Sequence, residues 1–343
     1  MHKASIIGVL LSIIFFWTAC TPRPGDELVP ELADDVLVFD LPVGFPDLPF
    51  PVDNHPTSLR VELGKQLFYD TRLSREGNLS CASCHLPQNA FADPRAVSLG
   101  TDGRAGLRNA PTLTNVAWQP HLFMDGGVPS LELQVMHPFN DPLEFDLHIV
   151  DAANQLASDE NYAQMSLSAY DRPLDPFVIM RAISSFERTL ISGNSAYDRF
   201  LAGDDTALST DAQAGMALFF SPETGCSDCH NGVFFTDFSF QNVGLYATYA
   251  DNGRQRVTGD PSDEGKFKVP TLRNVALTAP YMHDGSLPTL ADVVAHFNAG
   301  GELHSNQHPA VRPLNLNPEQ QAQLIVFLEA LTDESFINNP DFR

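Results

Sequence analysis

The stretch Cys81-Ala82-Ser83-Cys84-His85 and its counterpart Cys226-Ser227-Asp228-Cys229-His230 decide how this chain is organised, because both read C-x-x-C-H. This is the attachment signature of c-type haem, in which the two thiols add to the vinyl groups of the haem. The histidine that follows, His85 or His230, then supplies the proximal ligand of the iron. We therefore predict two covalently bound c-type haems, each held by the two cysteines of one motif.

Three other interpretations explain these motifs less completely. A disulfide does not need a histidine after each cysteine pair. A thioredoxin-like C-x-x-C expects a strand before it and a helix after it, whereas glycine and proline residues flank both motifs here. A zinc site would use all four cysteines and leave the two histidines unexplained. Haem attachment alone accounts for every fixed residue of both motifs.

The chain repeats itself around the two motifs. Upstream, Gly64-Lys65-Gln66-Leu67-Phe68 precedes the first motif and Gly215-Met216-Ala217-Leu218-Phe219 precedes the second. Downstream, a second block recurs 159 residues later, so that Pro111-Thr112-Leu113, Asn115-Val116-Ala117, Asp125-Gly126 and Leu131 return as Pro270-Thr271-Leu272, Asn274-Val275-Ala276, Asp284-Gly285 and Leu290. Repeats of this length are domains rather than solenoid units.

Apolar residues at helical spacing predict four helices, and few segments alternate as strands do. The predicted helices cover residues 176–192, 210–220, 290–298 and 318–331. The expected fold is therefore mainly α, with two duplicated cytochrome c-type haem domains and long loops. We place the N-terminal haem domain at 57–200 and the C-terminal haem domain at 201–343.

Composition narrows the class of protein. The chain has 343 residues, which suits two domains with a core each. Its 43% of apolar and 18% of charged residues exclude a disordered chain and one wholly embedded in a membrane. Twenty Lys and Arg against 43 Asp and Glu give a net charge of −23. Such a charge argues against a nucleic-acid partner and favours basic protein partners.

Residues 1–20 resemble the signal peptide of a bacterial lipoprotein. Lys3 is followed by an apolar run that ends in Thr18-Ala19-Cys20. Cys20 would become the new N-terminus and receive lipid, while an ordinary signal peptide or an uncleaved anchor are the alternatives. Residues 21–56 are rich in proline and acidic, which predicts a tether and an extended arm. We expect a periplasmic protein attached to a membrane only through its N-terminal lipid.

The two haem motifs and the repeated PTLxNVA and DG blocks resemble the bacterial di-haem cytochrome c peroxidases and their MauG relatives. The resemblance runs from about Val61 to Leu331 and includes residues 185–191 and 272–281. It implies that the N-terminal haem, on His85, reacts with hydrogen peroxide and that the C-terminal haem, on His230, receives electrons. Members of this family are often dimers, so the resemblance also implies a homodimer.

In this family a glutamine and a glutamate on the distal face of the first haem assist cleavage of the O–O bond. Both positions match here, which implies that Gln134 is a hydrogen-bonding positioner and Glu144 a proton shuttle. The family also holds Ca²⁺ between its haem domains, through an asparagine side chain and backbone carbonyls. Asn109, Thr278 and Pro280 fall on those positions, and carbonyl oxygens suit a hard cation.

Two positions near the first haem depart from the family pattern. Thr101 stands where many members carry a histidine that blocks the iron until the other haem is reduced. We therefore expect the first haem to be open in the oxidised protein. Met124 replaces a tryptophan that lies between the haems, and Trp118, close by in the sequence, does not fall on that position.

The sixth ligand of the second haem is a further departure. Peroxidases supply methionine and MauG supplies tyrosine at the position of Phe297, whose side chain has no ligating atom. His296 is adjacent but lies about 100° away around a helix. We assign the sixth ligand to His304, in the loop after Gly300-Gly301, with His308 and Met282 as the other candidates.

Three functions are consistent with the sequence. The first is a periplasmic peroxidase that reduces hydrogen peroxide to water with electrons from a small cytochrome c or cupredoxin. The second is a MauG-like enzyme that oxidatively modifies an aromatic residue of a partner protein. The third, a di-haem electron carrier, predicts two six-coordinate haems and gives Glu144 no role.

Lipidation of Cys20 is testable on the full-length protein. The protein should enter the detergent-rich phase on partitioning, because the lipid is its only expected membrane attachment. Cys20→Ser should return it to the aqueous phase. Equal partitioning of the two proteins would contradict a lipid on this cysteine.

Overall fold

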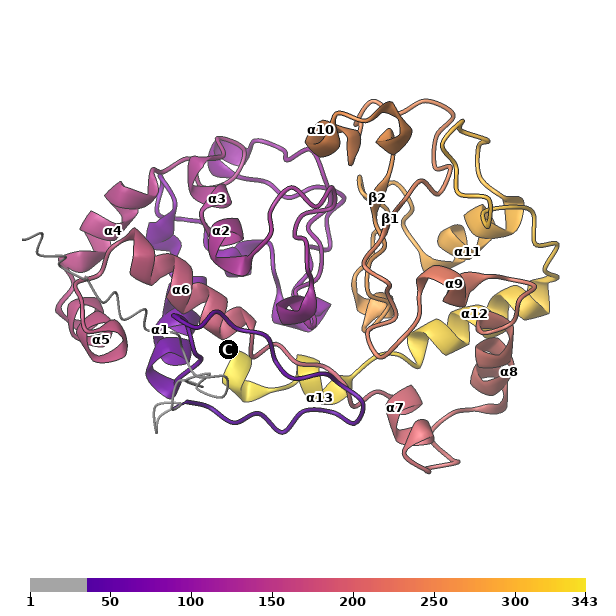
Figure 1. Ribbon diagram of the computed structural model, residues 1–343, viewed down its shortest axis with the longest axis horizontal. Helices are drawn as coiled ribbons and strands as arrows, with labels where there is room; N and C mark the ends of the chain where they lie inside the picture. Colours follow the sequence, from indigo (N-terminus) through magenta and orange to yellow (C-terminus); the bar gives the residue numbers. More distant parts are fainter. Residues whose placement is uncertain (1–35) are drawn as a thin grey trace, which may run out of the picture. The chain divides into compact units, whose positions relative to one another are not determined.

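The computed structural model describes residues 36–343, which belong to one compact unit and are mainly helical. Cys20, the rest of the signal peptide and residues 21–35 lie outside the described residues. The longer helices are α1 (Ser58–Tyr69), α4 (Ile149–Ala157), α5 (Glu160–Tyr170), α6 (Pro176–Glu187), α8 (Thr210–Phe219), α11 (Leu290–Ala299) and α12 (Pro318–Glu329). The shorter ones are α2 (Leu131–Val135), α3 (His137–Asn140), α7 (Ala196–Leu201), α9 (Cys226–Cys229), α10 (Gln255–Thr258) and α13 (Glu334–Ile337) (Figure 1). A single antiparallel pair, β1 (Phe240–Gln241) and β2 (Phe267–Lys268), accompanies them.

The mainly α class and the four predicted helices are confirmed. Helices α6 and α12 each begin with a proline in the first turn, where the missing N–H costs no hydrogen bond. Asp175 and Asn317 cap these helices by accepting backbone N–H bonds. Among the described residues, no helix is long and apolar enough to cross a membrane.

The glycine of each upstream repeat allows two helices to cross at close range. Helix α1 packs against α6, and α8 packs against α12. A Cβ atom on Gly64 would lie 1.8 Å from the carbonyl oxygen of Ala182. In the second crossing, a Cβ atom on Gly215 would lie 1.9 Å from the carbonyl oxygen of Gln323. No side chain fits in either place, so the repeated glycine marks the same contact in both halves.

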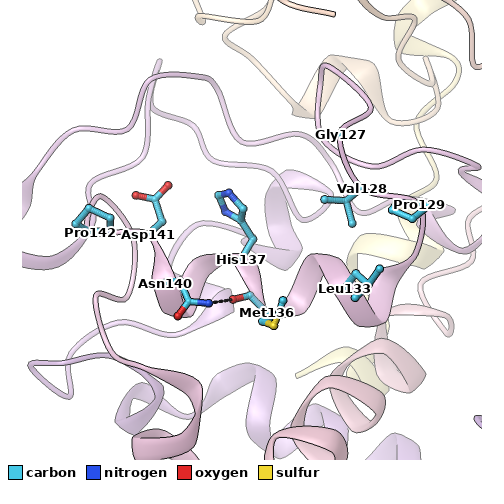
Figure 2. A pocket seen from close by; sticks show the side chains of 9 residues that line it. All are labelled: Gly127, Val128, Pro129, Leu133, Met136, His137, Asn140, Asp141 and Pro142. Atoms are coloured by element: carbon cyan, nitrogen blue, oxygen red, sulfur yellow. Dashed lines mark hydrogen bonds between the residues drawn. The ribbon is translucent and has the colours of Figure 1, made fainter. Parts of the chain in front are cut away.

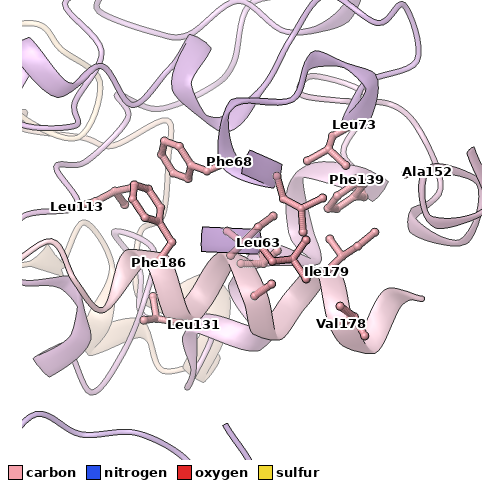
Figure 3. Packing of buried hydrophobic residues seen from close by; sticks show 14 of the residues in the cluster. Leu63, Phe68, Leu73, Leu113, Leu131, Phe139, Ala152, Val178, Ile179 and Phe186 are labelled. Atoms are coloured by element: carbon pink, nitrogen blue, oxygen red, sulfur yellow. The ribbon is translucent and has the colours of Figure 1, made fainter. Parts of the chain in front are cut away.

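The phenylalanine of each upstream repeat fills the space beside its crossing. Phe68 lies 5.1 Å from Phe186 between ring centroids, within a core that Leu63 and Ile179 complete (Figure 3). In the second half, Phe219 lies 5.2 Å from Phe327. Each half therefore has its own aromatic-rich core.

The repeated asparagines of the PTLxNVA blocks meet where the halves join. Asn115 accepts the backbone N–H of Ser192 and donates to the carbonyl of the same residue, both at 2.9 Å. Asn274 donates to the hydroxyl of Ser192 at 3.0 Å and accepts the backbone N–H of Asp333 at 2.7 Å. Asp333 in turn accepts the Ser192 hydroxyl. The duplication thus brings equivalent side chains to one buried polar junction.

The C-terminal segment returns to the first half of the chain. Phe336 and Phe342 belong to the first core, with ring centroids 5.8 and 6.0 Å from that of Phe91. Figure 1 shows the C-terminus beside α1, and the side chain of Lys65 donates to the carbonyl of Asp341. The proposed division near residue 200 stays a prediction, because the last residues pack on the other side of it.

Alanine at either crossing glycine should destabilise the protein. Each Cβ meets a backbone carbonyl, which cannot turn aside as a side chain can, so we expect a loss of about 3 kcal/mol in the free energy of unfolding. Urea unfolding of Gly64→Ala and Gly215→Ala measures this. Gly106→Ala is the control, because its Cβ would meet nothing closer than 3.5 Å. A loss equal to that of the control would contradict the crossing.

Candidate functional site

The first C-x-x-C-H motif orients its histidine in a way that suits a ligand of haem iron. Cys81–Ser83 form a single 3-10 turn, and His85 follows it with its Nδ1 2.8 Å from the carbonyl oxygen of Phe91. A carbonyl only accepts, so Nδ1 carries the proton and Nε2 keeps the lone pair that binds a metal. Burial lowers the pKa of His85, which keeps the ring neutral.

The second motif repeats this geometry. Cys226–Cys229 form α9, and Nδ1 of His230 lies 3.1 Å from the carbonyl oxygen of Phe235. Burial again lowers the pKa of the histidine. The threonine of each PTLxNVA block holds the loop behind the ligand, since Thr112 donates to the carbonyl of Ala90 and Thr271 to that of Phe234. Two oriented neutral imidazoles therefore lie in equivalent surroundings.

The four cysteines fit covalent haem attachment. None of the four forms a disulfide. Burial raises the pKa of each thiol, most strongly for Cys81, so none is poised as a thiolate ligand for zinc. The donor set of each motif is thus two neutral thiols and one imidazole with a free Nε2, which suits a c-type haem.

Thr101 anchors the loop that carries Glu144. Its fully buried hydroxyl lies 2.9 and 3.0 Å from the carbonyl oxygens of Glu144 and Phe145. Its backbone N–H donates to the same Glu144 carbonyl at 2.8 Å. The neighbouring Gly100 makes room for this contact, because its Cβ would lie 1.9 Å from the carbonyl oxygen of Leu143. Sequence comparison identifies Thr101 only as a missing histidine, whereas the structure shows that it positions the loop.

Glu144 has an acidity suited to proton transfer. Burial raises the pKa of this carboxyl to about 7, and the negative charge of Asp141 adds to the effect. The side chain is still 45% exposed, and its Oε1 lies 3.8 Å from Nδ1 of His137. His137, Asp141 and Glu144 form a cluster whose donor atoms lie within 4.8 Å of one another.

Gln134 lies on α2, which is tied to the rest of the protein by a buried ion pair. Arg188 contacts Glu132 at 2.8 Å, and the Asn54 amide donates to the same carboxylate at 2.9 Å. Burial alone would raise the pKa of Glu132, but these partners hold it below its usual value. The Gln134 amide makes no hydrogen bond to another described residue, so it remains available for a ligand.

The three residues predicted to bind calcium come from both halves. Asn109 donates its side-chain amide to the carbonyls of Arg95 and Ala96, which leaves its amide oxygen for a cation. Its backbone N–H donates to the carbonyl of His283, just beyond the loop that contains Thr278 and Pro280. The structure therefore brings the two segments together, and calcium binding stays a prediction.

His304 is buried, and its ring already makes hydrogen bonds within the protein. Its Nδ1 accepts the backbone N–H of Asn306 at 3.0 Å and lies 3.1 Å from the Asn242 amide. In this arrangement the proton of a neutral ring is on Nε2, so binding iron would require the ring to exchange these bonds. Nε2 of His296 donates to the carbonyl of Val243 at 3.0 Å. Ligation of the second haem by His304 stays a prediction.

A half-buried lysine, which the sequence analysis did not identify, binds the segment around Met124. Lys268 on β2 donates its backbone N–H to the Met124 carbonyl at 2.7 Å and its ammonium to the carbonyl of His121 at 3.1 Å. Burial lowers the pKa of Lys268 to about 8. Trp118 also reaches the second half, with its ring 5.1 Å from that of Phe234. No local pattern distinguishes such a lysine from an exposed one.

Comparison with known proteins places the chain in a class. Residues 58–206 match the family described as di-haem cytochrome c peroxidase, and the chain belongs to that family. It is similar to the cytochrome-c peroxidase IdrP1 of Denitromonas iodatirespirans, with 34% identity over 95% of this chain and 93% of that protein. It is also similar to the methylamine utilization protein MauG of Methylorubrum extorquens, with 35% identity over 84% of this chain and 82% of that protein.

A solved structure agrees with both similarities. The crystal structure of a MauG-like protein associated with microbial copper homeostasis matches with a TM-score of 0.86 and 34% identity. The match covers 90% of this chain and 99% of the other. The resemblance to di-haem peroxidases and MauG is thereby confirmed. Both named types occur among the relatives, so membership of the family leaves the choice between them open.

Covalent attachment is testable by intact mass. Protein produced together with a haem-attachment system should carry two haems, because each motif supplies two thiols. The double variant Cys81→Ala, Cys226→Ala keeps one thiol in each motif, and the attachment system needs two. Its mass after denaturation in acid and organic solvent should therefore lack both haems. A wild-type mass equal to that of the bare chain would contradict haem attachment.

Proposed function

We propose that this protein is a periplasmic di-haem peroxidase that reduces hydrogen peroxide to water. The observation that carries the proposal is the position of Glu144, on a loop whose backbone carbonyl Thr101 holds and which follows the helix bearing Gln134. The net charge of −23 favours a basic electron donor, for which a small cytochrome c or cupredoxin is the expected class. The similarity to cytochrome-c peroxidases supports the same activity.

Each residue of the site has a distinct role in this proposal. The first motif, with His85, holds the haem that meets peroxide, and the second, with His230, holds the haem that receives electrons. When bound, the haems supply the redox chemistry. Glu144 accepts a proton from peroxide and returns it to the departing oxygen. Gln134 orients the peroxide, and Thr101 keeps the Glu144 loop in place.

The arrangement proposed around the site has further parts. We infer two duplicated haem domains, supported by the repeated glycine crossings, with Ca²⁺ between them on Asn109, Thr278 and Pro280. We also infer periplasmic localisation with a lipid on Cys20, which the N-terminal sequence pattern supports. Homodimer formation is inferred from the family alone.

A MauG-like activity on a partner protein is the second candidate. The observation that favours it is Thr101, whose hydroxyl is bonded to two backbone carbonyls and offers no ligand to the first haem. The similarity to MauG and to a MauG-like structure agrees. Mass spectrometry of candidate partner proteins, with and without the enzyme and peroxide, distinguishes the two: a mass increase on an aromatic residue supports this alternative.

The open first haem can be tested by electron paramagnetic resonance of the fully oxidised protein. Because Thr101 replaces the blocking histidine, we expect a high-spin ferric signal without prior reduction. Thr101→His should convert this signal to low spin if the position faces the iron. An entirely low-spin wild-type spectrum would mean that another side chain caps the first haem.

Glu144→Gln tests the proton shuttle. The variant keeps the shape but removes the base, so the reaction of the oxidised protein with peroxide should slow by about 10²–10⁴-fold. In the wild type the rate should rise with pH through about 7, as Glu144 loses its proton, and then level off. The variant should lack that rise.

Stopped-flow mixing over a pH series measures both effects. Glu62→Gln is the matched control, since Glu62 is an exposed carboxylate on α1. A Glu144→Gln enzyme as fast as this control would contradict the proposed function.

A further inference from the structure

We propose that His137 relays protons from solvent to Glu144, with Asp141 as the charged partner of both groups. The inference rests on the proposed function and adds a residue that the family resemblance did not assign. Reduction of one hydrogen peroxide to two waters consumes two electrons and two protons. Glu144 moves a proton within the peroxide, so the two protons consumed must be supplied from solvent in every turnover.

The local fold brings the three side chains together. His137 begins α3, and the chain then turns back, because the backbone N–H groups of Glu144 and Asp146 both donate to the carbonyl of Asp141. The N–H of Phe145 donates to the carbonyl of Pro138. Glu144 therefore returns to the first turn of the helix, where its Oε1 lies 3.8 Å from Nδ1 of His137.

That distance suits a relay rather than a fixed ion pair. It is longer than a hydrogen bond, so a proton passes after a small side-chain rotation or through one bridging water. The His137 ring packs edge-on against Phe123 at 4.7 Å, which limits the directions in which it can turn. Its side chain is 46% exposed, so the ring contacts both solvent and Glu144.

A cavity of about 520 Å³ provides the solvent side of the relay. Figure 2 shows the side chains of His137 and Asp141 pointing into the same space, while Val128 and Leu133 lie on its apolar side. His137 and Asp141 are the only titratable residues among those that line it. The Asn140 amide donates to the carbonyl of Met136 instead of reaching the cluster. Protons entering from this cavity therefore meet His137 or Asp141 first.

The chemistry of the cluster favours transfer toward Glu144. Histidine is the side chain whose charge changes most readily near neutral pH, and its two nitrogens let it accept a proton on one side and release one on the other. One carboxyl oxygen each of Asp141 and Glu144 lies within 4.8 Å of a ring nitrogen of His137, so a proton on the ring has acceptors within reach. Release of the Nδ1 proton to Glu144 leaves a neutral ring whose remaining proton is on Nε2. The ring must therefore turn over, or exchange protons with solvent to return to the Nδ1–H form, before the next transfer.

The test compares single and repeated turnover in the holoenzyme. His137→Asn removes the relay and keeps a side chain of similar size. Reaction of the oxidised protein with one equivalent of peroxide should stay within about twofold of wild type, because Glu144 performs that step. Steady-state turnover, with ascorbate and a phenylenediamine mediator as the electron source, should fall by up to about 10²-fold. A raised concentration of phosphate buffer, which carries protons and does not coordinate the ferric iron as imidazole would, should restore part of the steady-state rate.

His148→Asn is the matched control. His148 is exposed and caps α4 by accepting the Val150 N–H, a role that asparagine also fills. Its turnover should equal that of wild type and should not respond to the phosphate concentration. A His137→Asn enzyme with wild-type turnover, or with a loss that phosphate does not reduce, would overturn the relay. Either result, together with a slow Glu144→Gln enzyme, would leave the proposed function intact, whereas a fast Glu144→Gln enzyme would remove both.

Discussion

Two helices can bring their backbones into contact only where the facing position has no side chain, and this constraint organises each half of the protein. At Gly64 the backbone of α1 lies against the carbonyl of Ala182 on α6, and at Gly215 that of α8 lies against Gln323 on α12. The crossings position the cores from which the loops extend. Those loops carry the C-x-x-C-H motifs and present each histidine with Nε2 free.

Local sequence patterns predicted the features that depend on neighbouring residues. The C-x-x-C-H spacing, the 159-residue repeat and the helical periodicity each involve residues close in the chain or duplicated within it. These patterns predicted the resemblance to the family, the mainly α class and the four helices. The positions of Glu144 and Gln134 came from resemblance to the family, and their catalytic roles remain proposals.

Those patterns could not predict contacts between segments that are distant in the sequence. In the sequence Thr101 is noted only because a histidine is missing there, and only the fold shows that its hydroxyl binds the backbone carbonyls of Glu144 and Phe145. Lys268 looks like any surface lysine until its ammonium is found against the carbonyl of His121. No sequence pattern predicts that Phe336 packs into the first core either, because a short apolar stretch does not indicate which segment it will pack against. These features depend on burial and on hydrogen bonds between distant segments, and neither of these produces a periodic pattern in the sequence.

The packing of Phe336 and Phe342 against Phe91 determines when the first half can be completed. A ribosome makes the chain from its N-terminus, so the first core lacks two of its aromatic rings until the last residues have been synthesised. Shortening the side chain of Phe342 would therefore be felt in the core of the first half, although the residue follows the second half in the sequence.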